Sequence, residues 1–217
     1  MILLASKSSG RLATLRAAGV DPLVRVSSVD EEAVLGELFQ RRRDAGLTAP
    51  SAAEQVQALA RAKALDVMAS TDPQEAEVVV GCDSMLEISG QVVGKPADAA
   101  QTRERWQMMS GGTGTLHTGH FLVRTADGAI AEGVSSATIR FGSPSPAEVE
   151  AYIATGEPLW CAGAFTIDGL GGAFIEGIDG DPHGVVGISL PLLRRLLTDL
   201  EVLWTDLWAP PAGRETD

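Results

Sequence analysis

At residues 77–84 the chain reads Glu77-Val78-Val79-Val80-Gly81-Cys82-Asp83-Ser84. The β-branched and apolar residues between Glu77 and Cys82 are typical of a buried central strand. Asp83 follows at the predicted end of that strand, where open α/β sheets place their functional groups. An ionised aspartate there needs a cation or water as its partner. An aspartate that ends a strand also caps turns, and the spacing leaves both roles open.

Further elements are predicted on both sides of this strand. Capping boxes mark two helix starts, at Ser51 with Glu54 and at Ser145 with Glu148, and Asp127-Gly128 predicts the turn of a long hairpin. Because strands and helices mix without strict alternation, a mixed α/β sheet is favoured over a doubly wound parallel one. Strands are expected at 1–5, 24–27, 77–82, 85–88, 91–93, 116–125 and 130–141, with short strands within 163–187, and helices at 12–19, 33–45, 52–68, 98–109, from 145 onward and at 190–200.

The length of 217 residues suits one large domain or two small lobes. We expect a single domain at 1–205 and a frayed C-terminal tail at 206–217. The two cysteines, Cys82 and Cys161, form neither a disulfide framework nor, with three scattered histidines, a zinc site. The first five residues are too short an apolar run for a signal peptide, and no run reaches the ~20 residues of a membrane span. These features predict a cytoplasmic protein that does not bind membranes.

The charge of the chain is strongly acidic. Seventeen Lys and Arg against 29 Asp and Glu give a formal net charge of −12. Such a surface repels the phosphates of nucleic acids, so stable binding to DNA or RNA is not expected. The one dense cationic run, Arg41-Arg42-Arg43, is followed at once by Asp44, which is typical of an exposed helix face rather than a polyanion site.

Residues 4–11, Leu-Ala-Ser-Lys-Ser-Ser-Gly-Arg, predict a strand, a turn of small residues and the start of a helix. Free backbone N–H groups at such a helix start bind anions, and Ser6, Ser8 and Arg11 would add donors. The spacing GxxxxGK[ST] of a Walker A loop is absent. An ordinary N-capped helix explains the same residues.

Two lysines and one carboxylate complete the candidate site. In Gly94-Lys95-Pro96 the proline holds Lys95 extended and the glycine permits close approach of a ligand, although a surface lysine is the alternative. Lys63 lies on an apolar helix, where a snorkelling lysine serves equally well. Glu31 belongs to a solvated acidic run unless it faces Asp83, since two carboxylates suit one Mg²⁺ ion. Together these groups suit a bound polyphosphate with a metal ion.

Taken in order, these segments resemble the Maf family of nucleoside triphosphate pyrophosphatases. The similarity runs from Leu3 to about Leu200 and is specific because many short motifs occur in register. The matching segments are 4–11 (family LASxSxRR), 29–31, 62–63, 80–84 (family GADT), 94–96, 110–111, 117–119, 152–159, 162–165, 169–172 and 185–191.

The resemblance implies the Maf/ITPase-like architecture, a mixed elongated β-sheet flanked by helices with two lobes around a deep cleft. It implies hydrolysis of the bond between the α- and β-phosphates, giving a nucleoside monophosphate and pyrophosphate, with Mg²⁺ or Mn²⁺ as cofactor and a homodimer as a common assembly. Asp83 matches the proton acceptor, and Glu31 with Asp83 the metal-associated carboxylates. The residues that match the phosphate- and substrate-binding positions are Ser6, Ser8, Arg11, Lys63, Lys95 and Asp168.

Three departures from the family pattern stand out. Gly10 replaces the first of two paired arginines, so Lys7 or a donor from the other lobe has to substitute for it. Asp168 stands where the family commonly has glutamine, which leaves the preferred base open. The segment 35–51 is longer than usual, and the surroundings of Asp168 look most like the actinobacterial branch.

Two other functions remain open on the sequence. A hydrolase specific for a modified base, with a house-cleaning role, would use the same catalytic residues. A nucleotide-binding regulator of septum formation, with little or no turnover, would not need both Asp83 and Glu31, and their joint presence argues against it.

Overall fold

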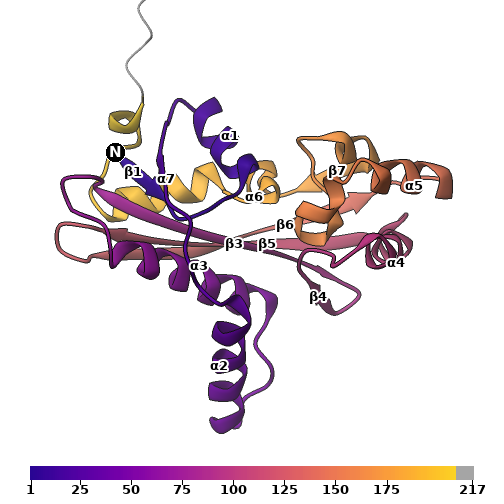
Figure 1. The fold of residues 1–217 in the computed structure, drawn as a ribbon, viewed down its shortest axis with the longest axis horizontal. Coiled ribbons are helices and arrows are strands. Elements are labelled where there is room, and N and C mark those ends of the chain that lie inside the picture. The colour runs from indigo at the N-terminus through magenta and orange to yellow at the C-terminus, as the bar shows by residue number, and fades with distance from the viewer. Residues whose placement is uncertain (209–217) are drawn as a thin grey trace, which may run out of the picture.

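The computed structural model describes residues 1–208, and its centre is a seven-stranded sheet with strand order β2-β1-β3-β5-β6-β7 and β4 paired to β3 (Figure 1). Strand β1 runs parallel to β2 and β3, and all other pairs are antiparallel. The mixed sheet that the sequence predicts is therefore confirmed. The strands are β1 (Ile2–Leu4), β2 (Leu23–Val24), β3 (Val78–Ile88), β4 (Gln91–Val93), β5 (Thr113–Arg124), β6 (Ile130–Phe141) and β7 (Ile175–Asp179).

Helices flank the sheet, and both predicted capping boxes, at Ser51 and Ser145, are present. Of the predicted tail at 206–217, the described part belongs to a short 3₁₀ helix and to Trp208, which pairs with Val20; residues 209–217 lie outside the described residues. The helices are α1 (Ser9–Ala17), α2 (Glu31–Asp44), α3 (Ala52–Met68), α4 (Ala99–Met109), α5 (Pro146–Ala154), α6 (Pro182–Val186) and α7 (Leu190–Asp199), with 3₁₀ helices η1 (Glu157–Trp160), η2 (Ala162–Ala164), η3 (Leu170–Phe174) and η4 (Trp204–Leu207).

One prediction about β3 is wrong. The strand does not end at Cys82 but continues to Ile88, because residues 78–87 pair without a break with β5. Asp83 therefore lies in the middle of a long strand. It lies at an edge of that strand that neither β1 nor β4 covers.

Two further predictions need correction. The strand expected at 24–27 is only Leu23–Val24, since the neighbouring β1 ends at Leu4. In the segment 163–187 only β7 is a strand, and the rest forms 3₁₀ turns and α6. Three glycines in that segment, Gly163, Gly180 and Gly187, have positive φ, which breaks an extended chain.

The long strands β3, β5 and β6 run through two lobes (Figure 1). In one lobe, α1 and α7 cover one face of the sheet, over an apolar core that includes Leu193. Helix α3 covers the other face, over a second core that includes Phe121. The other lobe, with α4, α5 and β7, has its own core around Trp106, whose ring makes edge contacts with three aromatic neighbours.

Helix α3 lies directly against the sheet because two glycines face it. A Cβ atom on Gly119 of β5 would lie 2.5 Å from the carbonyl oxygen of Val56, and one on Gly81 of β3 would overlap the carbonyl oxygen of Ala60. Side chains larger than hydrogen at these positions would push the helix away. The glycines thus set the distance between α3 and the residues of β3 that follow Gly81.

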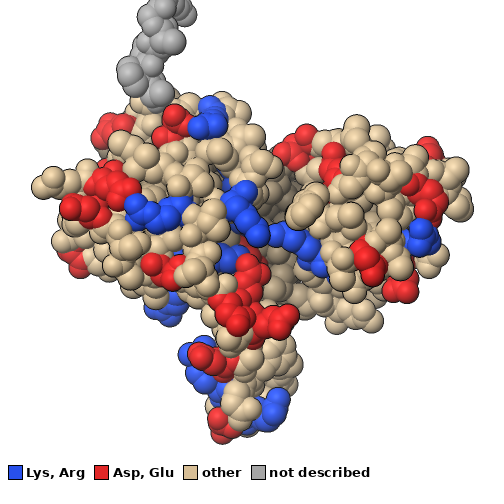
Figure 2. All heavy atoms as spheres, in the orientation of Figure 1, with Lys and Arg blue, Asp and Glu red and all other residues tan. Residues whose placement is uncertain are grey.

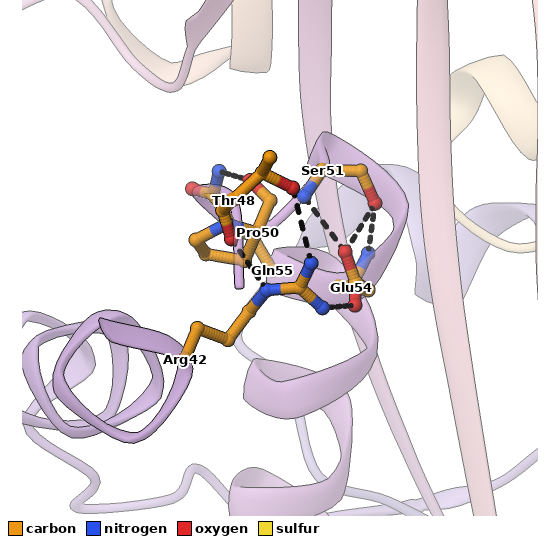
Figure 3. A network of polar contacts seen from close by, with 6 residues as sticks. All are labelled: Arg42, Thr48, Pro50, Ser51, Glu54 and Gln55. Carbon is orange, nitrogen blue, oxygen red and sulfur yellow. Dashed lines mark hydrogen bonds and ion pairs between the residues drawn. The ribbon is translucent and has the colours of Figure 1, made fainter. Parts of the chain in front are cut away.

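Helix α2 projects from the body of the molecule, and α3 is its main packing partner among the described elements (Figure 1). Arg42 joins the two helices: it forms an ion pair with Glu54, and its Nε donates to the carbonyl oxygen of Thr48 at 2.7 Å (Figure 3). The Ser51–Glu54 capping box and the bond from Gln55 to the carbonyl of Pro50 complete this network. No helix within residues 1–208 combines the length and apolar character that crossing a membrane requires.

Candidate functional site

The site lies at a gap along one edge of β3. β5 pairs with the opposite edge over residues 78–87, so β1 and β4 must share the first edge. β1 pairs only with 78–80 and β4 only with 86–88, which leaves residues 81–85 without a partner strand on that edge within the described chain. β1 runs parallel to β3 and β4 antiparallel, so both run toward this gap and end at it. The loop 5–8 and the segment 94–96, which follow them, therefore converge beside Asp83 and Ser84.

Asp83 and Ser84 point to opposite faces of the sheet, as successive strand residues do. Asp83 faces α3, where Lys63 Nζ lies 2.6 Å from its Oδ1. The same ammonium lies 2.7 Å from Oε1 of Glu31, the first residue of α2. The side chains of Lys63 and Asp83 are 13% and 11% exposed, whereas that of Glu31 is 55% exposed. Three charged groups predicted as site residues thus form one cluster.

The two carboxylates of this cluster differ in acidity. Burial raises the pKa of Asp83, and the positive charges of Lys63 and Arg11 oppose that rise without cancelling it. Burial also acts to raise the pKa of Glu31, but its bond to Lys63 and the charges of Lys63, Lys95 and Lys7 outweigh it, so the net pKa is lowered. Asp83 is therefore the better proton acceptor of the pair, and Glu31 the more firmly ionised carboxylate.

Arg11 is fixed on the other face of β3. It is 9% exposed, and its guanidinium makes three bonds: Nε to the carbonyl oxygen of Gly187 at 2.7 Å, Nη1 to Ser6 Oγ at 3.0 Å and Nη2 to Ser84 Oγ at 3.0 Å. A guanidinium carries five N–H groups, so two remain for a ligand. A buried, rigid cation of this kind is suited to bind a phosphate.

The loop between β1 and α1 holds the two predicted serines in different roles. Ser6 is buried, and its Oγ accepts hydrogen bonds from the N–H of Ser8 and from Arg11. Within residues 1–208, the hydroxyl proton of Ser6 has no acceptor. Ser8 is the N-cap of α1 and accepts from the N–H of Arg11 at 3.4 Å. Ser6 can donate to a ligand. Ser8 caps the start of α1, which is the alternative role that the sequence offered for these residues.

Lys95 follows β4 and its charge reaches the cluster, since it lowers the pKa of Glu31; Lys7 does the same from the loop after β1. The main chain beside Lys95 is held by Arg105, which donates to the carbonyl oxygens of Gly94 at 2.6 Å and Lys95 at 3.3 Å. Figure 2 shows Lys and Arg side chains across the hollow between the two lobes, with Asp and Glu side chains immediately beside them. This local charge contrasts with the net −12 of the chain.

Asp168 lies across from the start of α1. A Cβ atom on Gly10 would lie 3.5 Å from its Oδ2 and 3.1 Å from Cγ1 of Val186. The two positions that depart from the family pattern, Gly10 and Asp168, are therefore neighbours, and a side chain at position 10 would contact Asp168 and Val186. Asp168 also accepts a bond from Thr166.

The donor set of the cluster fits a hard divalent cation. The oxygens of Glu31 and Asp83, from two separate elements, both approach one positive group, the ammonium of Lys63. Mg²⁺ is commonly held by one or two carboxylates together with substrate phosphates and water. No cluster of three His, Cys, Asp or Glu occurs among the described residues, so phosphate oxygens and water would have to complete the coordination.

Sequence reasoning did not find two partners of Arg11, Ser84 and Gly187, nor Thr118, which contacts Ser84. Ser84 Oγ lies 2.8 Å from Thr118 Oγ1, which donates to the carbonyl oxygen of Gly184 at 2.8 Å. Both hydroxyls lie within segments that resemble family motifs, which was the available signal. Their meeting depends on the register of β3 and β5, where Ser84 is opposite Thr118.

Comparisons with known proteins identify the family of this chain. The family model described as "Maf-like protein" matches residues 1–200. Curated relatives named "Nucleoside triphosphate pyrophosphatase" include one from Saccharopolyspora erythraea, 50% identical over 217 residues, which cover 98% of this chain and 99% of the relative. Another, from Streptomyces coelicolor, is 50% identical over 209 residues (96% and 95%), and one from Mycobacterium sp. (strain JLS) is 49% identical over 212 residues (95% and 97%). With its sheet, its site motifs and these full-length matches in accord, the chain belongs to the Maf family.

Proposed function

We propose that this protein is a nucleoside triphosphate pyrophosphatase that hydrolyses ribo- or deoxyribonucleoside triphosphates, standard or modified, to a monophosphate and pyrophosphate. The observation that carries the proposal is the cluster of Glu31, Lys63 and Asp83 at a gap on the sheet edge where two cationic loops converge. The names of the full-length relatives support the same activity.

Asp83 is the general base of the proposed reaction. Water attacks a phosphorus atom beside the α–β bridge, the bond from that atom to the bridging oxygen breaks, and the proton of the water passes to Asp83. Because burial raises the pKa of Asp83, its carboxylate accepts a proton more readily than an exposed aspartate would. Lys63, 2.6 Å away, holds the carboxylate in place for this step.

The positive side chains bind the triphosphate and offset the charge that develops on the leaving group. Arg11 acts from one face of β3, and Lys63 and Lys95 from the side of the acidic cluster. Phosphoryl transfer depends mainly on such positioning and electrostatic stabilisation. Ser6 would add a hydroxyl donor, and Asp168, close to Gly10 at the start of α1, is the proposed contact to the substrate.

Mg²⁺ or Mn²⁺, held by Glu31 and Asp83, would neutralise phosphate oxygens and acidify the attacking water. We further propose that the protein acts in the cytoplasm, without stable binding to nucleic acid or membrane, and that it forms a homodimer. The acidic net charge supports the expectation about nucleic acid.

The test is a panel of nucleoside triphosphates incubated with the purified full-length chain and Mg²⁺ or Mn²⁺. We expect monophosphate and pyrophosphate in equal amounts and no turnover after chelation with EDTA. Diphosphate and inorganic phosphate as products would overturn the proposed bond cleavage. Binding of nucleotide by calorimetry without any product would instead favour the alternative, a nucleotide-binding regulator without turnover.

A further inference from the structure

A directed chain of hydrogen bonds ends at Arg11. Thr118 is fully buried, and its single hydroxyl proton is donated to the carbonyl oxygen of Gly184, which can only accept. In the 2.8 Å contact between Thr118 and Ser84, Ser84 must therefore be the donor. The oxygen of Ser84 is then free to accept from Arg11 Nη2. Each hydroxyl donates away from the arginine and accepts from the side toward it.

The chain of bonds links four elements to one another. Arg11 belongs to α1, Ser84 to β3, Thr118 to β5 and Gly184 to α6. Ser84 and Thr118 are directly opposite in a continuous antiparallel ladder, so their relative position is fixed by backbone pairing rather than by side-chain packing. The end of α6 supplies the second anchor, since the carbonyl of Gly187 accepts from Arg11 Nε.

We infer that Ser84 and Thr118 are positioning residues that orient the guanidinium of Arg11 toward the triphosphate. This rests on the phosphate-binding role of Arg11 in the proposed function. Three of the five N–H groups are committed to Gly187, Ser6 and Ser84, which fixes the plane of the guanidinium and leaves one N–H on each terminal nitrogen.

The acceptor of Ser84 decides whether this orientation holds. Arginine has no acceptor atom, so the hydroxyl proton of Ser84 must point away from Arg11 for the bond between them to exist. Among the described residues, Thr118 is the only acceptor for that proton. Without the Thr118 hydroxyl, Ser84 is free to rotate, and the guanidinium loses one of the contacts that define its plane.

The test begins with Thr118→Val, which keeps the shape of the side chain and removes the hydroxyl. We expect kcat/KM for a nucleoside triphosphate to fall about 10- to 100-fold, the size of a lost hydrogen bond to a charged group. Thr118→Ser, the matched control, keeps the hydroxyl and is expected to stay within about 3-fold of the wild type. Ser84→Ala should reproduce the loss without removing the donor to Gly184, and it serves if Thr118→Val folds poorly.

A double-mutant cycle with Arg11→Met separates positioning from a general structural role. If Thr118 and Ser84 act through Arg11, Thr118→Val or Ser84→Ala causes no further loss of kcat/KM in the Arg11→Met background. In that background, either substitution still lowers the free energy of unfolding measured with urea. An equal loss of kcat/KM in both backgrounds would overturn the inference. An unchanged rate in Arg11→Met alone would instead remove Arg11 from the proposed function.

Discussion

The backbone of Gly81 in β3 lies so close to Ala60 in α3 that a Cβ atom on the glycine would overlap the carbonyl oxygen of Ala60. Ala60 and Lys63 are three residues apart and share a face of the helix. The approach that Gly81 permits is therefore also the approach that brings Lys63 to Asp83, two residues further along β3. A residue without a side chain sets the distance between two charged groups of the site.

Gly81→Ala is expected to lower stability by about 1–3 kcal/mol, because the obstruction is helix backbone and cannot rotate away. Turnover should fall as well, since α3 carries Lys63. Urea unfolding and the product assay measure the two effects. Gly36→Ala in α2 is the matched control: apart from the local backbone of its own helix, no atom of the described residues lies within 4 Å of its added methyl group, and stability should be unchanged or slightly higher. Equal behaviour of the two variants would show that α3 is not held as close as described.

Asp83→Asn is expected to abolish turnover, because the amide cannot accept the proton of the attacking water. Burial raises the pKa of Asp83, which means that the ionised carboxylate lowers the stability of the folded state at neutral pH. Lys63 also retains Glu31 as a partner. The urea midpoint of the variant at pH 7 should therefore be no lower than that of the wild type, and nucleotide binding should persist. Wild-type turnover in this variant would exclude Asp83 as the base.

Lys95→Ala is expected to reduce the rate about 10- to 1,000-fold, the effect of one lost electrostatic donor in an active site. Its charge is felt at Glu31, so the loss should appear with every nucleotide of the panel. Arg43→Ala removes an equally positive and exposed side chain from the far end of α2, and it should leave the rate unchanged. If the two variants had the same rate, Lys95 would be a surface lysine.

His120 predicts a pH dependence of stability. Burial lowers its pKa from the usual 6.5 to about 4, and its Nε2 accepts from the N–H of Ser189, the N-cap of α7. Between these values the unfolded state binds the proton and the folded state does not. The contribution is therefore fully present above pH 6.5 and is lost as the pH falls toward 4. The full loss amounts to about 3 kcal/mol.

The comparison is between wild type and His120→Gln, whose amide oxygen reaches the position of Nε2 and can accept from the N–H of Ser189 but does not titrate in this range. Urea unfolding from pH 7 to pH 4 should show the stability advantage of the wild type shrinking as the pH falls. Parallel stability curves for the two proteins would mean that His120 does not keep its lowered pKa in solution.

The sequence indicates most of the elements because their signals are local. Ser51 with Glu54 and Ser145 with Glu148 act within one helical turn, and the helix starts they predict are confirmed. The mixed sheet is confirmed for the same reason, since the long hairpin of β5 and β6 turns at Asp127-Gly128. The charged residues of the site also carried local signals, through the turns and apolar stretches around them.

The relations that sequence reasoning missed are all long-range. The end predicted for β3 at Asp83 was wrong because the strand is extended by its pairing with β5, which no local pattern records. The pairing of Ser84 with Thr118 likewise depends on register, and the bond of Arg11 to Gly187 on the placement of α6. The contact of Lys63 with two carboxylates required that α2, α3 and β3 meet.

At the interrupted edge of β3, the proposed substrate-binding segments are structurally separate from the β3–β5 ladder, which holds the sheet together. The segments that follow β1 and β4 hang from short strands of three residues each, while the ladder of β3 with β5 continues unbroken behind them. Replacing a side chain in either segment alters no interstrand bond of that ladder. Substitutions in these segments can therefore change substrate specificity while the interstrand hydrogen bonds of the supporting sheet stay intact.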